Sequence, residues 1–211
     1  MPRIIATTRL RHALNLQGRR AQLLVALVAT LLLPLAGGVP LRDALRYDRA
    51  AIASGEFWRL ATGHFVHLDA AHAGLNAAGL LLLWVLFADA GGWRAWLLAA
   101  LLSLVAMDLG FWCLQPDLAW YVGASGLLHG IMAAGTFALL RGKDRLAPAM
   151  AALFVAKLAW EQGIGALPFE TRGTVIVAAH LYGALGGIVA GCLPRPLRVA
   201  IMPTTLWQEE R

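Results

Sequence analysis

Six long stretches of the chain consist almost entirely of apolar residues, and charged residues fall mainly between them. The stretches run over 21–38, 70–90, 95–114, 122–140, 146–166 and 174–193. A helix that crosses the hydrocarbon core of a bilayer needs about 20 mostly apolar residues. None of the six shows the alternation over roughly ten residues that is typical of outer-membrane barrel strands. The pattern therefore predicts an all-α polytopic membrane protein with six transmembrane helices.

The composition also fits a membrane protein better than a soluble one. Hydrophobic residues make up 59% of the 211 residues and charged residues only 14%, against about 45–50% and about 25% in soluble domains. This apolar excess excludes a disordered chain. It also argues against a nucleic-acid partner, which the net charge of +6 would otherwise suggest. Two cysteines, Cys113 and Cys192, are too few for a disulfide-rich scaffold.

The distribution of positive charge predicts the orientation of the chain. With the N-terminus in the cytoplasm, twelve of the 18 Lys and Arg residues fall on the inner side and five on the outer side, in agreement with the positive-inside rule. We therefore expect both termini in the cytoplasm and an uncleaved first span. The chain divides into a basic cytoplasmic segment over 1–20, a membrane domain over 21–193 and a cytoplasmic tail over 194–211. A long polar loop over about 40–69 lies outside, and loops of this length are often functional.

The fourth span opens with a serine between glycines, in Gly123-Ala124-Ser125-Gly126. At a helix start the backbone N–H of Ser125 has no partner within the helix and can face an anion. Gly126 and Gly130 are four residues apart, so a neighbouring helix can approach this face closely. On its own the motif fits either a packing stripe with an incidental serine or the site of a nucleophile.

The sixth span carries a matching glycine face that includes one histidine. His180, Gly183, Gly187 and Gly191 follow the spacing i, i+3, i+7 and i+11 and lie on one side of a helix. If the two glycine faces meet, the imidazole of His180 reaches the hydroxyl of Ser125. Such a pair supplies a nucleophile and a general base. The alternative is that His180 only forms a hydrogen bond in helix packing.

The second span contributes two hydrogen-bond donors. His72 and Asn76 are four residues apart and share a helix face, and Asp69 just before them suits an N-cap. Donors aimed at a developing oxyanion are most effective in a site of low dielectric. The alternative is that both side chains hold helices together by polar contacts.

Histidines near the second span raise a different possibility, a metal site. They are His64, His67 and His72, with His180 as a possible fourth ligand. The sequence contains no H-E-x-x-H motif, and we expect neither a metal nor another cofactor. Glu161 follows Lys157 by four residues in the fifth span, which favours a neutral ion pair over a direct role with substrate. The sequence identifies no partner for Asp108 in the third span.

As a set, these residues resemble the rhomboid family of intramembrane serine proteases. The motifs that carry the resemblance are Trp58-Arg59, His72-x-x-x-Asn76, Gly123-Ala124-Ser125-Gly126 and Ala179-His180-Leu181-Tyr182-Gly183 through Gly187. Their order and spacing match a six-span rhomboid-like bundle over about residues 20–193. Within the family the chain is most similar to the bacterial rhombosortase branch, on Gly123 to Gly130 with His129, on Lys157 to Gln162 and on Ala179 to Gly183.

The resemblance implies catalytic roles for the matched residues. Ser125 would be the nucleophile and His180 the general base of a two-residue dyad, since no Asp or Glu lies where it clearly orients His180. The N–H of Ser125 and the side chains of His72 and Asn76 would form the oxyanion hole. His67 corresponds loosely to a position that holds water.

The resemblance also implies roles for residues around this centre. Gly126, Gly130, Gly183 and Gly187 would pack the helices. Trp58 and Arg59 would place the outer loop in the membrane interface. The fifth span would be a lateral gate for substrate. Its candidate recognition residues are Lys157, Trp160, Glu161 and Gln162.

The rhombosortase branch implies a substrate class and a location. Its members are associated with secreted proteins that carry a C-terminal Gly-Gly motif, a hydrophobic helix and a basic tail. We therefore expect a transmembrane substrate and membrane lipids as partners, in the bacterial inner membrane, with the site open to the periplasm. The alternative is an inactive rhomboid-like protein that binds membrane clients, although such proteins lose the serine or the histidine. A transporter would need a polar path through the midplane, whereas these polar groups converge at one end of three helices.

Overall fold

The computed structural model describes residues 18–87, 89–166 and 176–193. Helices occupy all six apolar stretches: α2 (Arg19–Leu32), α6 (Ala70–Phe87), α7 (Trp93–Leu114), α8 (Ser125–Arg141), α9 (Ala147–Gly163) and α10 (Val177–Cys192). The prediction of an all-α fold is confirmed. Most of the expected N-terminal segment (1–17 of 1–20) and all of the expected tail (194–211) lie outside the described residues.

The lengths of these helices bear on the number of spans. Three described helical runs are long and apolar enough to cross a membrane, namely Arg20–Leu45, Ala70–Phe87 and Trp93–Leu114. The helices α8 and α9 have 17 residues each, and α10 has 16. These are slightly shorter than the roughly 20 residues of a typical span. The structure thus supports several membrane helices, and the count of six stays a prediction.

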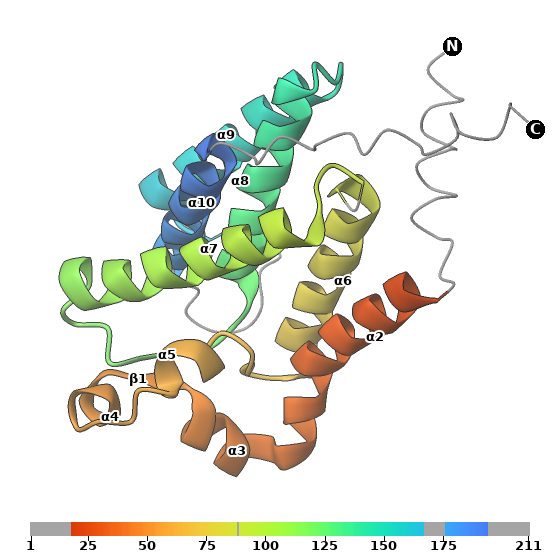
Figure 1. Ribbon diagram of the computed structural model, residues 1–211. Coiled ribbons are helices and arrows are strands. Elements are labelled where there is room, and N and C mark those ends of the chain that lie inside the picture. Colours follow the sequence, from red (N-terminus) through yellow and green to blue (C-terminus); the bar gives the residue numbers. More distant parts are fainter. Residues whose placement is uncertain (1–17, 88, 167–175, 194–211) are drawn as a thin grey trace, which may run out of the picture.

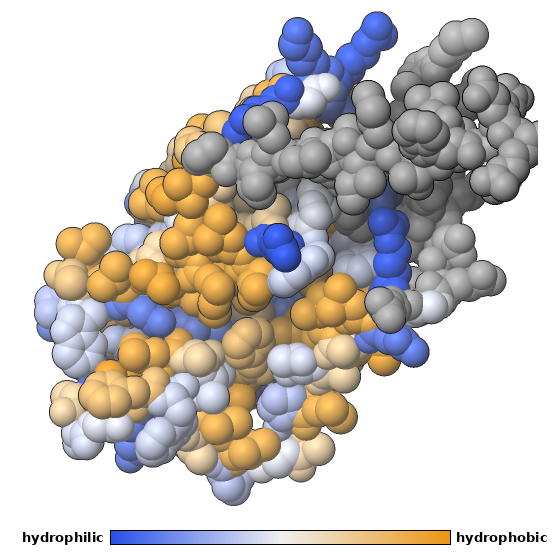
Figure 2. Space-filling model, in the orientation of Figure 1, coloured by the Kyte–Doolittle hydropathy of each residue, from blue (hydrophilic) through white to orange (hydrophobic). Residues whose placement is uncertain are grey.

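The helices form a bundle in which α8 is central. It packs against α10, α7, α9 and α6, while α2 lies on the outer side of α6 (Figure 1). Large apolar side chains cover much of the surface over α7, including Leu101, Val105 and Leu109, which are at least half exposed (Figure 2). In water such a surface would be unfavourable, but it is what a helix facing lipid tails presents.

The outer loop folds into short elements at one end of the bundle, below α7 in Figure 1. They are η1 (Leu33–Gly37), α3 (Gly38–Leu45), β1 (Tyr47–Asp48), α4 (Arg49–Ala53) and α5 (Arg59–Thr62). Strand β1 pairs antiparallel with β2 (Trp120–Tyr121), with Tyr47 opposite Tyr121. The Tyr47 ring is fully buried against Phe111. The loop is therefore not only polar, as its sequence indicated, but has an apolar core.

Arginine side chains hold this outer region together. Arg49 donates hydrogen bonds to the carbonyls at the end of α7 and in the loop after it, those of Phe111, Trp112, Gln115 and Leu118. A helix C-terminus leaves such carbonyls without partners within the helix. Arg59 donates to the carbonyls of Asp43 and Arg46 and pairs with Glu56 at 2.7 Å. The outer loop is thereby fixed over the bundle end at which α6 and α8 begin.

Candidate active site

Ser125 and His180 meet between α8 and α10. The Oγ atom of Ser125, the first residue of α8, lies 2.9 Å from Nε2 of His180. His180 is 2% exposed, and Ser125 is half-buried at the start of its helix. A hydroxyl hydrogen-bonded to an imidazole nitrogen is the arrangement of a nucleophile and its base.

The close approach of the two helices depends on glycine. A Cβ atom built at Gly183 would overlap the carbonyl oxygen of Gly126, and one at Gly187 would overlap that of Gly130. Any larger residue would push α10 away from α8. The sequence predicted that these faces could meet, and their contact brings His180 within reach of Ser125.

A carboxylate lies on the other side of His180. Oε1 of Glu161, in α9, is 2.8 Å from Nδ1 of His180 and 2.5 Å from Nζ of Lys157. The Glu161 side chain is fully buried and that of His180 is 3% exposed. The ion pair expected between Lys157 and Glu161 is present. The expectation that no carboxylate lies where it can orient His180 is wrong, because α9 turns Glu161 toward α10.

His129 completes this cluster from α8. Its ring stacks on that of His180, with centroids 4.0 Å apart and planes 8° apart. Nε2 of His129 lies 2.5 Å from Nζ of Lys157, and Nδ1 lies 2.6 Å from the carbonyl oxygen of Ser125. Because an ammonium only donates and a carbonyl only accepts, the network assigns His129 as neutral, with its proton on Nδ1.

Three possible metal ligands are close together in the same cluster. One donor atom each of His129, Glu161 and His180 lies within 4.8 Å of the others. The Lys157 ammonium, however, donates hydrogen bonds to two of them, His129 and Glu161. A metal ion would have to displace this positive charge from its partners, so the donor set suits an ammonium better than a metal. His64 and His67, part of the alternative metal set in the sequence, are not in this cluster.

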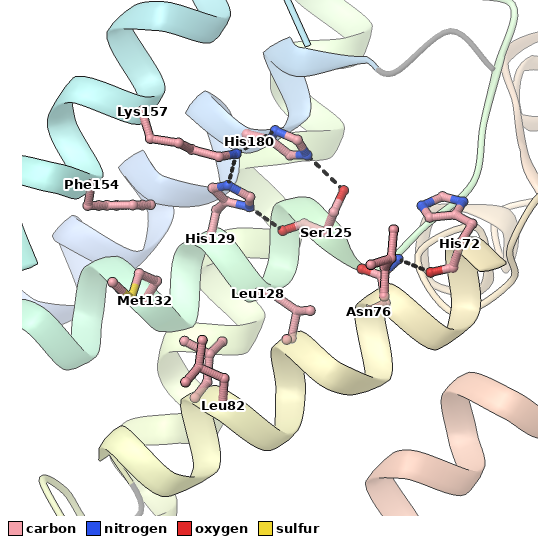
Figure 3. A pocket seen from close by; sticks show the side chains of 13 residues that line it. His72, Asn76, Leu82, Ser125, Leu128, His129, Met132, Phe154, Lys157 and His180 are labelled. Carbon is pink, nitrogen blue, oxygen red and sulfur yellow. Dashed lines mark hydrogen bonds between the residues drawn. The ribbon is translucent and has the colours of Figure 1, made fainter. Parts of the chain in front are cut away.

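His72 and Asn76 lie on the opposite side of Ser125, on α6 (Figure 3). Asp69 accepts a hydrogen bond from the backbone N–H of His72 at 2.8 Å, as an N-cap does. Nδ1 of His72 accepts from the N–H of Leu68 at 3.5 Å, which leaves Nε2 as the protonated, donating nitrogen. The imidazole packs against Gly123, whose φ of 123° and lack of a side chain make room for it. Asn76 donates one amide hydrogen to the carbonyl of His72 and keeps a second.

A cavity of about 280 Å³ connects these groups. Ser125, His180, His72 and Asn76 line its polar end, and apolar side chains such as Leu82, Leu128, Met132 and Phe154 line the rest (Figure 3). The lining comes from α6, α8, α9 and α10. The cavity can therefore hold an apolar segment of chain next to the serine.

Comparisons with known proteins give the family of this chain. The model of the Rhomboid domain matches residues 54–196. The chain belongs to the rhomboid family. It is also 25% identical over 152 residues to the Bacillus subtilis (strain 168) protein named "Putative rhomboid protease YdcA". The aligned region covers 72% of this chain and 74% of that protein.

Family membership and the apolar helices together give the general class of this rhomboid, a membrane protein of a protease family. Rhomboid proteases act on transmembrane substrates within membranes, and the apolar helices make the chain a multi-pass membrane protein. The matched region contains the outer-loop motif and all the residues described around Ser125. It begins at residue 54, so α2 and α3 precede it.

The remaining predicted residues of this rhomboid occupy its periphery. Trp58 is 54% exposed beside Phe57, which is 67% exposed, on the outer loop. Trp160 is 45% exposed on α9. The exposed Gln162 donates to the carbonyl of Val177 at the start of α10. The structure thus separates Trp160 and Gln162, at the surface, from Glu161, in the interior.

Two contacts of this rhomboid were not predicted. Asp108, for which the sequence identified no partner, lies 3.1 Å from Nε2 of the fully buried His64. His129, for which the sequence predicted no role of its own, contacts Lys157 and stacks on His180. The spacing of Ser125 and His129, one helical turn apart, was the available signal for the second.

Proposed function

We propose that this rhomboid is a serine intramembrane endopeptidase in which Ser125 is the nucleophile and His180 the general base. The observation that carries the proposal is the 2.9 Å hydrogen bond between them, at one end of an apolar cavity. His180 takes the Oγ proton as Oγ attacks the scissile carbonyl, and returns it to the leaving amine. Water then releases the acyl group from Ser125.

The negative charge on the carbonyl oxygen needs donors during the attack. We propose the backbone N–H of Ser125, Nε2–H of His72 and the second amide hydrogen of Asn76. The N–H of Ser125 is free of intrahelical bonding because Ser125 begins α8. In a site of low dielectric each such donor contributes strongly, with a loss of about 10²–10³ in kcat when one is removed.

The proposed substrate is a transmembrane segment near a C-terminus, with glycines at the cleavage point. A helix satisfies its own carbonyls, so it must unwind before a serine can attack one. Glycines favour unwinding because they are poor helix formers. The Gly-Gly, hydrophobic and basic tail of rhombosortase-type substrates has these features, and the segment would enter between α6 and α9, which both line the cavity. Trp160 and Gln162 are the proposed contacts on the outside of this gate.

The test uses the protein in membranes with a substrate that carries such a tail. Ser125→Ala and His180→Ala should each abolish tail removal and labelling by a fluorophosphonate probe. Ser54→Ala, which changes an exposed serine of the outer loop, is the matched control and should keep both. Cleavage at the normal rate in either site variant would exclude the serine mechanism. Substrate binding without any cleavage by the wild type would favour the alternative, an inactive client-binding rhomboid.

A further inference from the structure

We propose that Glu161 is a positioning residue that orients His180, and that Lys157 keeps the Glu161 carboxylate ionised. The site would then be a chain of three groups, Ser125, His180 and Glu161, instead of a dyad. This inference rests on the proposed serine protease function and adds to it. It replaces substrate recognition, which the sequence suggested for Glu161, with a role inside the enzyme.

The distances support a continuous chain. Nε2 of His180 lies 2.9 Å from Oγ of Ser125, and Nδ1 lies 2.8 Å from Oε1 of Glu161. The two nitrogens of one imidazole therefore face a hydroxyl and a carboxylate. A base oriented by a third group is the general arrangement of activated nucleophiles. Glu161 is 1% exposed, so it reaches His180 and not the surface where a substrate helix would dock.

The charge on Glu161 decides which nitrogen of His180 carries the proton. An ionised carboxylate only accepts, so Nδ1 must donate to it and Nε2 is left to accept the Ser125 proton. A neutral carboxyl group would donate to Nδ1, so the imidazole proton would be on Nε2. A protonated Nε2 cannot accept the proton of Ser125 and cannot act as the base. The state of Glu161 thus selects the productive tautomer of His180.

Lys157 provides the positive charge that a buried carboxylate requires. Burying one unpaired charge is very costly, and the cost falls when an oppositely charged partner with good geometry lies beside it; the Lys157 side chain, 24% exposed, lies beside the fully buried Glu161. Nζ of Lys157 contacts Oε1 of Glu161 and Nε2 of His129. His129 in turn donates to the carbonyl of Ser125 and anchors the ammonium to the helix that holds the nucleophile. Nζ of Lys157 also lies 3.4 Å from Nδ1 of His180. Because both nitrogens are donors here, the two groups are neighbours without a hydrogen bond between them.

The proton transfers balance without a proton reaching Glu161. The Oγ–H bond breaks as the Oγ–carbon bond forms, the proton moves to Nε2, and the carbonyl π electrons move to oxygen. When the C–N bond breaks, the same proton goes to the leaving amine. During both steps Glu161 accepts from Nδ1 of the imidazolium and stabilises its positive charge.

The deciding experiment compares variants of Glu161 and Lys157 in membranes, with kcat, KM, fluorophosphonate labelling of Ser125 and thermal stability as readouts. Glu161→Gln should lower kcat about 10²–10⁴-fold and slow labelling in parallel, with KM nearly unchanged. Glu161→Asp should recover part of kcat, because it keeps the charge. The double variant Glu161→Gln with Lys157→Met leaves no unpaired buried charge, and should lose no more kcat than Glu161→Gln alone, since Lys157 acts through Glu161.

Asp108→Asn is the matched control. It changes a second carboxylate that contacts a buried histidine, at 3.1 Å, outside the site. It should lower thermal stability and leave kcat unchanged.

Several outcomes would overturn the inference. They are an unchanged kcat in Glu161→Gln, a change in KM or substrate choice alone, and no recovery in Glu161→Asp. If Glu161→Gln does not fold, the double variant Glu161→Gln with Lys157→Met takes its place. A wild-type kcat in this double variant would reject the positioning role of Glu161. Failure of the proposed function looks different, because the wild type itself would then show no labelling that depends on Ser125.

Discussion

Polar side chains within a membrane domain are stable only when they form hydrogen bonds with one another, and the residues around Ser125 do so as a connected series of contacts. Ser125 contacts His180, His180 contacts Glu161, and Glu161 contacts Lys157. The Lys157–Glu161 pair was predictable because both residues lie on one helix, four apart. The contact of Glu161 with His180 was not, since it depends on how α9 rotates and approaches α10, which a sequence of apolar residues does not specify.

His67 provides a test of the site's surroundings through pH. It lies in the loop before α6, is 4% exposed, and its ring centroid is 5.1 Å from that of His72. Burial, and next the neighbouring His72, lower the pKa of His67 from 6.5 to about 4. Between these two values the unfolded chain binds a proton that the folded chain does not. The contribution of His67 to the free energy of unfolding is therefore fully present above pH 6.5. It is lost as the pH drops toward 4, and the loss amounts to about 3 kcal/mol.

The measurement is thermal unfolding in detergent from pH 7 to pH 4.5 for the wild type and for His67→Asn. The variant has no imidazole at this position, so its melting temperature should fall less over this range than that of the wild type. The comparison uses the two slopes, so that any constant loss from the substitution cancels. Parallel curves for the two proteins would show that His67 is not held neutral by its environment.

At the level of helices, the apolar stretches predicted the secondary structure well and the outer loop poorly. Helix α6 begins at residue 70 as expected, and α7 ends at residue 114 as expected. Apolar residues in long runs specify such helices by local hydrogen bonding alone. The strand pair β1–β2 joins positions 47 and 121. Pairings so far apart in sequence depend on tertiary contacts, such as those of Arg49 with the end of α7.

The contact between α8 and α10 leads to a prediction about packing. Gly187→Ala would place a methyl group where the backbone carbonyl of Gly130 lies, and a backbone atom cannot rotate away as a side chain can. Overpacking of this kind costs about 1–3 kcal/mol. Separation of the helices would also lengthen the hydrogen bond between His180 and Ser125. We expect a lower melting temperature and a lower kcat.

The matched control is Gly74→Ala, on an exposed face of α6 where an added Cβ has no neighbour within 4 Å. Alanine favours a helix over glycine by about 0.5–1 kcal/mol, so this variant should be equally stable or slightly more so, with normal kcat. Both proteins are compared by thermal unfolding and by cleavage of the same substrate. Equal stability of the two variants would mean that the glycine contact does not limit the approach of the helices.

Over the whole molecule, contacts between helix ends show which ends lie together, and the charges predict which side of the membrane each set faces. Arg20, near the start of α2, pairs with Asp89 just after α6 at 2.9 Å, and Arg141 at the end of α8 donates to the carbonyl of Gly191 near the end of α10. These basic ends belong to the side assigned to the cytoplasm. The starts of α6, α8 and α10 and the end of α9, which carry His72, Ser125, His180 and Glu161, belong to the opposite side. With the basic ends in the cytoplasm, we predict that the site opens to the periplasm.

Cysteine accessibility tests this arrangement directly. With Cys113 and Cys192 replaced by serine, Asp117→Cys puts a thiol in the loop after α7 and Lys143→Cys puts one in the loop after α8, both at exposed positions. In intact cells or spheroplasts a membrane-impermeant maleimide should label the first and not the second, and after permeabilisation it should label both. The comparison is valid where each variant still cleaves substrate. Labelling of the position-143 variant alone in intact cells would reverse the orientation and place Ser125 near the cytoplasm, because the two loops lie at opposite ends of the same bundle.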